Sequence, residues 1–187
     1  MRYWSIALWL LFSASSTFAD VPLTPRTLDP EARATLALAI ERSALVRALV
    51  AEIESSNVVV HIQFSWELPG GIGGTTRFVT SRGGYRYVRI VLSNRLQGHD
   101  RVAILGHELE HAAEIARSDV YDRDGIRRLL EATGYQVAEL FFETQSAQRA
   151  ERTIRQELVL QTQPVVELHH QHLRAAGAKT AAEVAKR

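Results

Sequence analysis

Residues 104–116 read ILGHELEHAAEIA, a helix-forming apolar stretch that contains titratable side chains. His107 and His111 are four residues apart, so on a helix they lie on one face about 6 Å from each other. Two imidazoles at this spacing can bind one zinc-like ion at roughly 2 Å each. Glu108 is rotated by about 100° around the helix axis relative to His107. Its carboxylate would therefore lie beside the ion without binding to it. The stretch therefore matches H-E-x-x-H, in which the glutamate is the general base of metal-dependent hydrolysis.

The residues around this motif predict a helix that is buried over much of its surface. VAIL precedes the motif, AAEIA follows it, and Leu109 lies inside it. Two imidazoles without partners would be costly in such surroundings, whereas a metal ion satisfies both. We therefore interpret His107 and His111 as metal ligands and not as polar surface.

A catalytic zinc ion needs a third protein ligand, and the residues leave two candidates open. A third histidine soon after His111 is excluded, because that stretch reads AAEIAR. Glu114 lies on the same helical face, where it can reach the ion or orient His111 as an outer partner. Glu143 is the stronger candidate. It shares the inward face of a predicted helix over 136–160 with Leu140, Ala147, Ala150 and Ile154, and a buried acid needs a partner.

The rest of the chain predicts helices around a small sheet. Asp29 and Pro30 start a helix that runs to about Ser55. VVVHIQFSWE, at 58–67, alternates as a strand with one buried face. TTRFVTS and YRYVRIVLS flank a Gly83-Gly84 turn and predict a hairpin. Further helices are expected over 100–117 and 124–132. This order predicts an α+β fold with a small antiparallel sheet packed against helices.

The N-terminal residues resemble a secretory signal. Arg2 precedes an apolar run from Ile6 to Phe12, and Thr17-Phe18-Ala19 fits a cleavage site. The run is far shorter than the ~20 residues that a membrane span needs. We expect residues 1–19 to be a cleaved signal peptide, and the mature chain to be periplasmic or secreted without a membrane span. Residues 20–29 would form an extended arm, 30–160 the domain, and 161–187 a helical or disordered tail.

The composition of the chain excludes some kinds of metal ligand and makes one class of partner unexpected. The chain has no cysteine, which excludes disulfides and thiolate ligands. Its 22 Lys and Arg are balanced by 21 Asp and Glu and are interleaved with them, so we expect no nucleic-acid partner.

GHELEHAAEIA, followed about thirty residues later by FETQSA, resembles the zincin metallopeptidases of the glutamate-ligand (gluzincin) type. Residues 43–158 also resemble a group of exported bacterial HExxH proteins. The resemblance implies a minimal zincin-like catalytic domain, with zinc held by His107, His111 and Glu143 and with Glu108 as base. It also implies a peptide or protein substrate lying along an edge strand, which FVTS or YRYVRIVLS would provide. Such enzymes usually add an oxyanion-stabilising Tyr or His, for which the candidates are Tyr121, Tyr135, His169 and His170.

The expected function is therefore that of an exported zinc-dependent peptidase. The alternative is a non-enzymatic module that binds peptides or proteins and has a structural or vestigial zinc site. The short chain keeps this alternative open, because it leaves little sequence for substrate pockets beyond the core.

Overall fold

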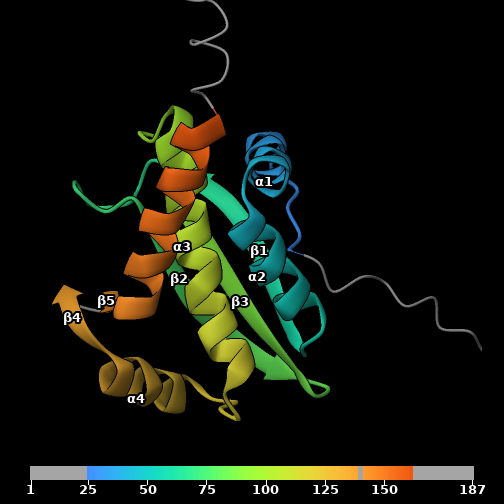
Figure 1. Cartoon of the computed structure of the whole chain (residues 1–187). Helices are drawn as coiled ribbons and strands as arrows, with labels where there is room; N and C mark the ends of the chain where they lie inside the picture. Colours follow the sequence, from blue (N-terminus) through green and yellow to red (C-terminus); the bar gives the residue numbers. More distant parts are fainter. Residues whose placement is uncertain (1–24, 139–140, 162–187) are drawn as a thin grey trace, which may run out of the picture.

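The computed structural model describes residues 25–138 and 141–161, which fold into helices and two small sheets (Figure 1). The fold is α+β, as the sequence predicts. The helix over 145–161 is called the last helix below. The other elements are α1 (Pro30–Arg42), α2 (Ala44–Glu54), β1 (Val58–Ser65), β2 (Gly74–Arg82), β3 (Tyr85–Ser93), α3 (Gly98–Arg117), α4 (Arg123–Thr133), β4 (Gly134–Ala138) and β5 (Phe141–Thr144).

The main sheet has the order β1-β3-β2 and is mixed, which corrects the antiparallel prediction. The β2–β3 hairpin is antiparallel as expected, but β1 pairs with β3 in parallel. The loop over 66–73 carries the chain past the position of β3, so the apolar strand β3 lies between its two neighbours. YRYVRIVLS is therefore the central strand. Of the two stretches predicted to provide an edge strand for a substrate, only FVTS lies on one, β2.

The first helix is broken, whereas the sequence predicts one helix from Asp29 to about Ser55. Ser43 is buried and has an extended backbone, with φ −129° and ψ 123°. Its hydroxyl oxygen accepts from the Val46 amide at 3.0 Å and so caps α2. The same hydroxyl donates to Glu157 of the last helix. This tertiary contact holds the break between α1 and α2.

The predicted helix over 136–160 is wrong in its first part, because β4 and β5 form a hairpin there and the helix begins at 145. Aromatic residues such as Tyr135 and Phe142 favour strands. A Cβ atom at Gly134 would overlap the Glu143 carbonyl, so glycine allows the two strands to approach. Thr144 then accepts a hydrogen bond from the Ala147 amide at 3.1 Å and caps the last helix.

Helix α3 is the centre of the fold. It contacts α1, α2 and all three strands of the main sheet (Figure 1). A Cβ atom at Gly106 would overlap Cδ1 of Ile154, so the last helix lies directly against α3. The core consists of the inward residues of these elements, among them Val60, Ile62, Val88, Ile90, Leu92, Leu105 and Leu109.

The end of α3 is fixed to β3 by a buried arginine. The Arg86 guanidinium donates to the carbonyl oxygens of Ile115 at 2.6 Å and Ala116 at 3.1 Å, and to Asn57 Oδ1 at 2.6 Å. A cation at a helix C-terminus is favourable for the helix dipole, and these bonds also satisfy carbonyls that the helix leaves unpaired. Arg86 thereby helps to fix the position of α3 on the sheet.

The two chain ends are described only in part. Arg26, in the predicted N-terminal arm, pairs in parallel with His61 of β1. The predicted signal peptide, residues 1–19, lies outside the described residues, as does all of the predicted tail except Gln161, which is helical. Within the described ranges, no helix has the length and apolar character needed to cross a membrane.

Candidate metal centre

Helix α3 places His107, Glu108 and His111 in the interior of the protein. Their exposed fractions are 7%, 4% and 5%. The two imidazole rings lie one helical turn apart, with centroids separated by 5.0 Å and planes at 72°. The sequence motif thus forms a buried pair of rings on one face of a regular helix.

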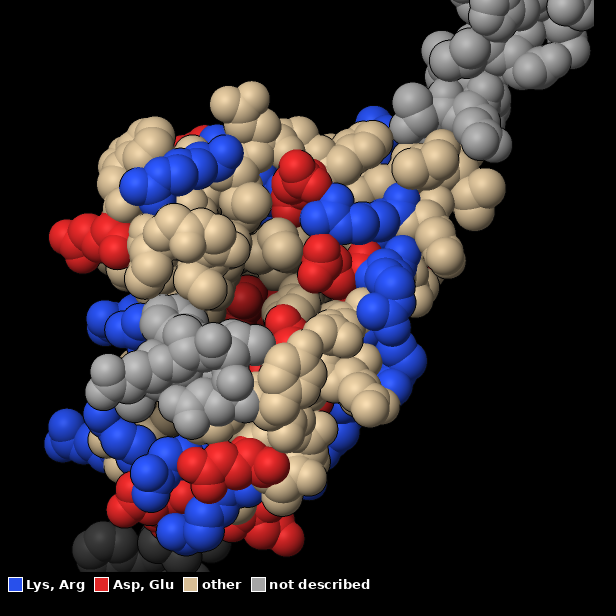
Figure 2. Space-filling model, turned by 90° about the vertical axis from the view of Figure 1, so that its left-hand side faces the viewer, with Lys and Arg blue, Asp and Glu red and all other residues tan. Residues whose placement is uncertain are grey.

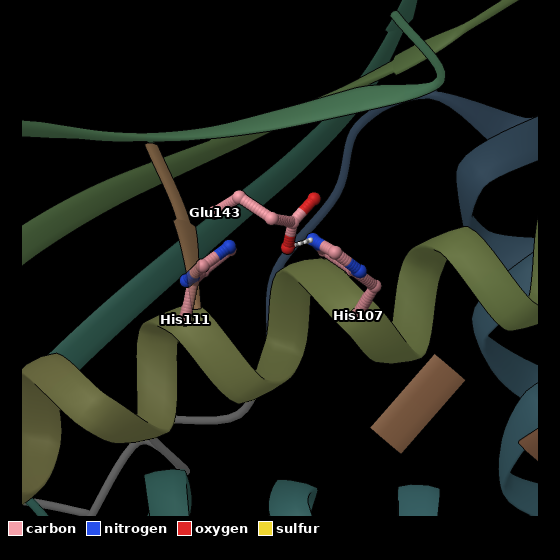
Figure 3. Close-up of side chains that lie close together, drawn as sticks. All are labelled: His107, His111 and Glu143. Atoms are coloured by element: carbon pink, nitrogen blue, oxygen red, sulfur yellow. Dashed lines mark ion pairs between the residues drawn. The ribbon is translucent and has the colours of Figure 1, made fainter. Parts of the chain in front are cut away.

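Glu143 joins this pair from β5. Its Oε1 lies 3.2 Å from Nε2 of His107, and one ligand atom from each of His107, His111 and Glu143 lies within 4.8 Å of the others. Figure 3 shows the three side chains converging, with Glu143 between the rings. The sequence predicts this residue as the stronger candidate for the third ligand, but on a helix. It lies instead on a strand, directly before the cap of the last helix.

Three atoms of this group are buried and make no hydrogen bond among the described residues. They are Nδ1 of His107, Nε2 of His111 and Oε1 of Glu143. Leaving a buried polar atom unsatisfied costs about 1–3 kcal/mol, so such atoms in a folded protein need an explanation. Nδ1 of His107 lies within ion-pair distance of Glu151. A divalent cation between the side chains would satisfy the other two, Nε2 of His111 and Oε1 of Glu143. Two imidazoles and one carboxylate are also a donor set of catalytic zinc sites, so these residues fit a zinc ion.

Each imidazole is also approached by an outer carboxylate. Glu114 Oε2 lies 3.0 Å from Nδ1 of His111, and Glu151 Oε2 lies 3.3 Å from Nδ1 of His107. The Glu114 contact is a hydrogen bond, whereas Glu151 lies only within ion-pair distance of His107. A carboxylate that is hydrogen-bonded to Nδ1 fixes the ring and its tautomer, which leaves Nε2 for a metal ion. Glu114 therefore lies on the far side of His111 from Glu143, in the orienting position and not among the three converging side chains.

Electrostatics at the centre favour positive charge. Burial lowers the pKa of His107, but the contact with Glu143 and the charges of Glu108, Glu143 and Glu151 outweigh this effect and raise it to about 9. Burial alone would raise the pKa of Glu114, but hydrogen bonds with His111 and Thr144 lower it, so this carboxylate stays charged. The surrounding acids therefore favour a cation at the position where the imidazoles meet.

Glu108 is held by the edge strand β2. The Thr76 hydroxyl lies 2.7 Å from Oε2 of Glu108 and 3.0 Å from its main-chain carbonyl oxygen. A Cβ atom at Gly74 would lie only 2.7 Å from Oε1 of Glu108, so the strand passes directly against the carboxylate. Burial raises the pKa of Glu108, while the charges of His111 and His107 oppose the increase. A side chain fixed in this way is suited to accept a proton.

Sequence reasoning missed Thr76, Gly74 and Glu151. The adjacent glycines at 73 and 74 were a signal that a backbone approaches another group closely, but they did not reveal which group. Glu151 is paired with Arg155 four residues later on the same helix. This pairing is visible in the sequence, but the contact with His107 depends on the packing of two helices.

The three converging side chains lie at the base of a cleft of about 690 Å³. Figure 2 shows a hollow on this face, with acidic side chains inside it. Residues 71–79 of β2 and the preceding loop form one wall. Helix α4 forms another wall, with Ile126 and Leu130 supplying apolar surface between the charged residues Arg123 and Arg127.

Of the predicted oxyanion-stabilising residues, the two tyrosines are described, and each makes a hydrogen bond away from the metal-binding group. Tyr121 accepts a hydrogen bond from Asn57 Nδ2 at 2.7 Å, and Tyr135 accepts one from Gln148 Nε2 at 2.9 Å. Neither tyrosine lines the cleft. His169 and His170 lie outside the described residues.

No family model, no curated protein and no solved structure matches the chain. Its function is therefore inferred from its own residues and their geometry.

Proposed function

We propose that the protein is a zinc-dependent peptidase of the gluzincin type that acts in the periplasm or outside the cell. The observation that supports it best is the convergence of His107, His111 and Glu143 in the interior, where His111 Nε2 and Glu143 Oε1 are buried and make no hydrogen bond among the described residues. A cation among these three side chains explains why they converge in the interior. Glu108 lies next to them at the base of a cleft large enough for a peptide segment. Export is supported by the N-terminal sequence.

His107, His111 and Glu143 would hold the ion, with Glu151 and Glu114 orienting the two imidazoles. Zinc is favoured because imidazole and carboxylate donors suit it. When bound, zinc supplies a Lewis acid that lowers the pKa of a water far below that of bulk water, toward about 7, and polarises a carbonyl group.

Glu108 carries the proton transfers. Its carboxylate accepts a proton from the attacking water, whose oxygen forms a bond to the peptide carbonyl carbon. The same group then donates that proton to the leaving amine as the carbon–nitrogen bond breaks. Thr76 keeps the carboxylate in one orientation between these two transfers. No external co-reactant other than water is needed.

The edge strand β2 would align the substrate. It forms one wall of the cleft, and its outer edge has no neighbouring strand in the described sheet. An extended peptide can form main-chain hydrogen bonds to such an edge. A substrate on β2 would lie beside Glu108, because the first residues of this strand contact that carboxylate.

Peptide hydrolysis by the zinc-loaded chain tests this proposal, with Glu108→Gln as the matched variant. We expect the wild type to cleave members of a mixed peptide library and Glu108→Gln to bind zinc normally but to cleave about 10³-fold more slowly. Fully zinc-loaded wild type that cleaves nothing would contradict the peptidase proposal. That result would favour the alternative, a peptide-binding module with a structural zinc ion.

A further inference from the structure

The face of the main sheet opposite the core carries a row of basic residues. The strands β1, β2 and β3 contain no Asp or Glu. In the register of the sheet, His61 lies opposite Arg89, and Arg89 lies opposite Arg77. Arg26 pairs with His61 on the other side. These four residues, here called the basic row, lie side by side across four neighbouring segments.

The basic row faces outward. On the strands β1 and β3, the neighbours Val60, Ile62, Val88 and Ile90 are buried, whereas His61, Arg89 and Arg77 are exposed. Residues paired across strands have Cβ atoms about 5 Å apart, and like charges at that distance destabilise a sheet. Burial lowers the pKa of His61, and the charges of Arg26 and Arg89 lower it further. The row is therefore electrostatically unfavourable in the isolated chain.

Acids of the part of the chain that the structure describes do not compensate this charge at Arg26 or Arg89. No ion pair joins either residue to an acid of the described ranges. The sequence of residues 162–187 offers no acidic run either. It contains two acids, Glu167 and Glu183, against four basic residues, Arg174, Lys179, Lys186 and Arg187.

The basic row is continuous with the cleft. Arg77 and Arg89 belong to the row and also line the cleft that contains the metal centre. Arg123 and Arg127 of α4 line the same cleft. A ligand that enters the cleft and continues over the edge strand β2 thus meets positive charge along its path.

We propose that the basic row binds an acidic segment of the polypeptide whose scissile bond lies in the cleft. Its acidic carboxylates would complement Arg26 and Arg89, which form no ion pair with an acid of the described residues. An extended polypeptide is thin enough to pass from the concave cleft onto the sheet, whereas a lipid surface cannot enter the cleft. The part concerning the scissile bond rests on the proposed peptidase function, but binding to the row requires neither metal nor catalysis.

Fluorescence anisotropy with a labelled oligo-glutamate peptide tests this inference on the full metal-free chain. We expect salt-sensitive binding that Arg26→Glu/Arg89→Glu weakens by about tenfold or more. The matched control is Arg128→Glu/Arg152→Glu, which makes the same change in net charge at exposed positions outside the row. This control should stay within about twofold of the wild type. Arg26→Gln/Arg89→Gln removes repulsion within the row, so it should fold at least as stably as wild type and still weaken binding.

Three results would overturn the inference. They are no binding at low salt, an equal loss in the control variant, and tighter row-dependent binding of phosphatidylglycerol vesicles or single-stranded DNA than of the peptide. The hydrolysis assay separates this inference from the proposed function. Row-dependent peptide binding by a zinc-loaded chain that cleaves nothing contradicts the peptidase. If the wild type and Arg26→Glu/Arg89→Glu cleave both acidic and neutral peptides at the same rates, the basic row does not bind the substrate.

Discussion

The two sides of the candidate metal centre are built in different ways. His107 and His111 lie one turn apart on α3, so the geometry of a single helix fixes their spacing. Glu143 comes from the β4–β5 hairpin and depends on the close approach at Gly134 and on the cap at Thr144. The difference shows that local spacing can specify two candidate ligands of a site, while the position of the third candidate requires the tertiary fold.

Removal of a ligand should have the largest effect and should distinguish the two sides. We expect His107→Ala to weaken zinc binding by more than about 100-fold, since even loss of an outer partner costs 10–100-fold. Glu143→Ala should also weaken zinc binding by more than about 100-fold. It should keep some residual zinc affinity, because the helical pair of imidazoles remains. Competition with a chromophoric chelator measures both. Unchanged affinity in Glu143→Ala would indicate that Glu114 or Glu151 is the third ligand.

Gly74→Ala should impair Glu108 without removing the ligands. The added Cβ atom would lie 2.7 Å from Oε1 of Glu108, so the carboxylate must move. A displacement of about 1 Å at a catalytic group can slow a reaction about 100-fold. The rate of peptide hydrolysis should therefore fall about 100-fold, while the zinc affinity stays unchanged. Gly70→Ala is the matched control, because a Cβ atom there meets nothing within 4 Å. Equal rates in the two variants would contradict the assigned position of Glu108.

The outer carboxylates should contribute less than the ligands. Glu151→Gln and Glu114→Gln each remove a charge from Nδ1 of one imidazole but leave the three converging atoms in place. We expect each to weaken zinc binding by 10–100-fold, which is typical of such partners. The chelator titration used for the ligand variants measures this effect. If Glu114→Gln weakened zinc binding as much as His107→Ala does, Glu114 would itself be a ligand.

The packing of the last helix on α3 should matter for stability. Gly106→Ala places a methyl group where Cδ1 of Ile154 lies, and such overpacking costs about 1–3 kcal/mol. Ile154→Val removes that Cδ1 atom. The double variant should therefore lose less stability than the sum of the two single changes, which urea denaturation can measure. Simple additivity would show that the two helices do not meet at this point.

The smallest effect is expected at Asp29, far from the ligands. Burial alone would raise its pKa, but amide groups of Phe64, Ala32 and Glu31 donate to the carboxylate and lower it below the usual value. Its stabilising contribution is thus present above about pH 3.9 and is lost as pH falls through the lower folded pKa. Asp29→Asn should remove this dependence, with a difference below about 1 kcal/mol because the group is largely solvated. Urea denaturation at about pH 3 and about pH 7 measures it. An identical acid dependence in both proteins would contradict this assignment.

Short-range patterns in the sequence were sufficient for much of the fold. The helix bearing the H-E-x-x-H motif, the β2–β3 hairpin and the short helix α4 follow from periodicity, turn residues and caps. The parallel pairing of β1 with β3 was not predictable in this way, because a strand pattern does not specify its partner. The break at Ser43 was missed for a similar reason, since the contact with Glu157 is distant in sequence.

At the candidate site too, short-range patterns do not specify contacts between segments that are distant in the sequence. The sequence pattern favours Glu143 because an acid on an inward helical face needs a partner. Glu143 does lie beside His107, but on a strand and not on a helix. Thr144 is a residue type that commonly caps helices and was a usable signal that the last helix starts after it. The contacts of Glu108 with Thr76 and of His107 with Glu151 join elements far apart in the chain, so no local pattern predicted them.

The most direct test of the account is the zinc content of the folded, full-length chain after saturation and dialysis, measured by elemental analysis. We predict one tightly bound zinc ion for each chain, and its loss when His107, His111 or Glu143 is replaced by alanine. A folded chain that retains no zinc, or that retains it unchanged in all three variants, would contradict the claim that these side chains form one metal centre.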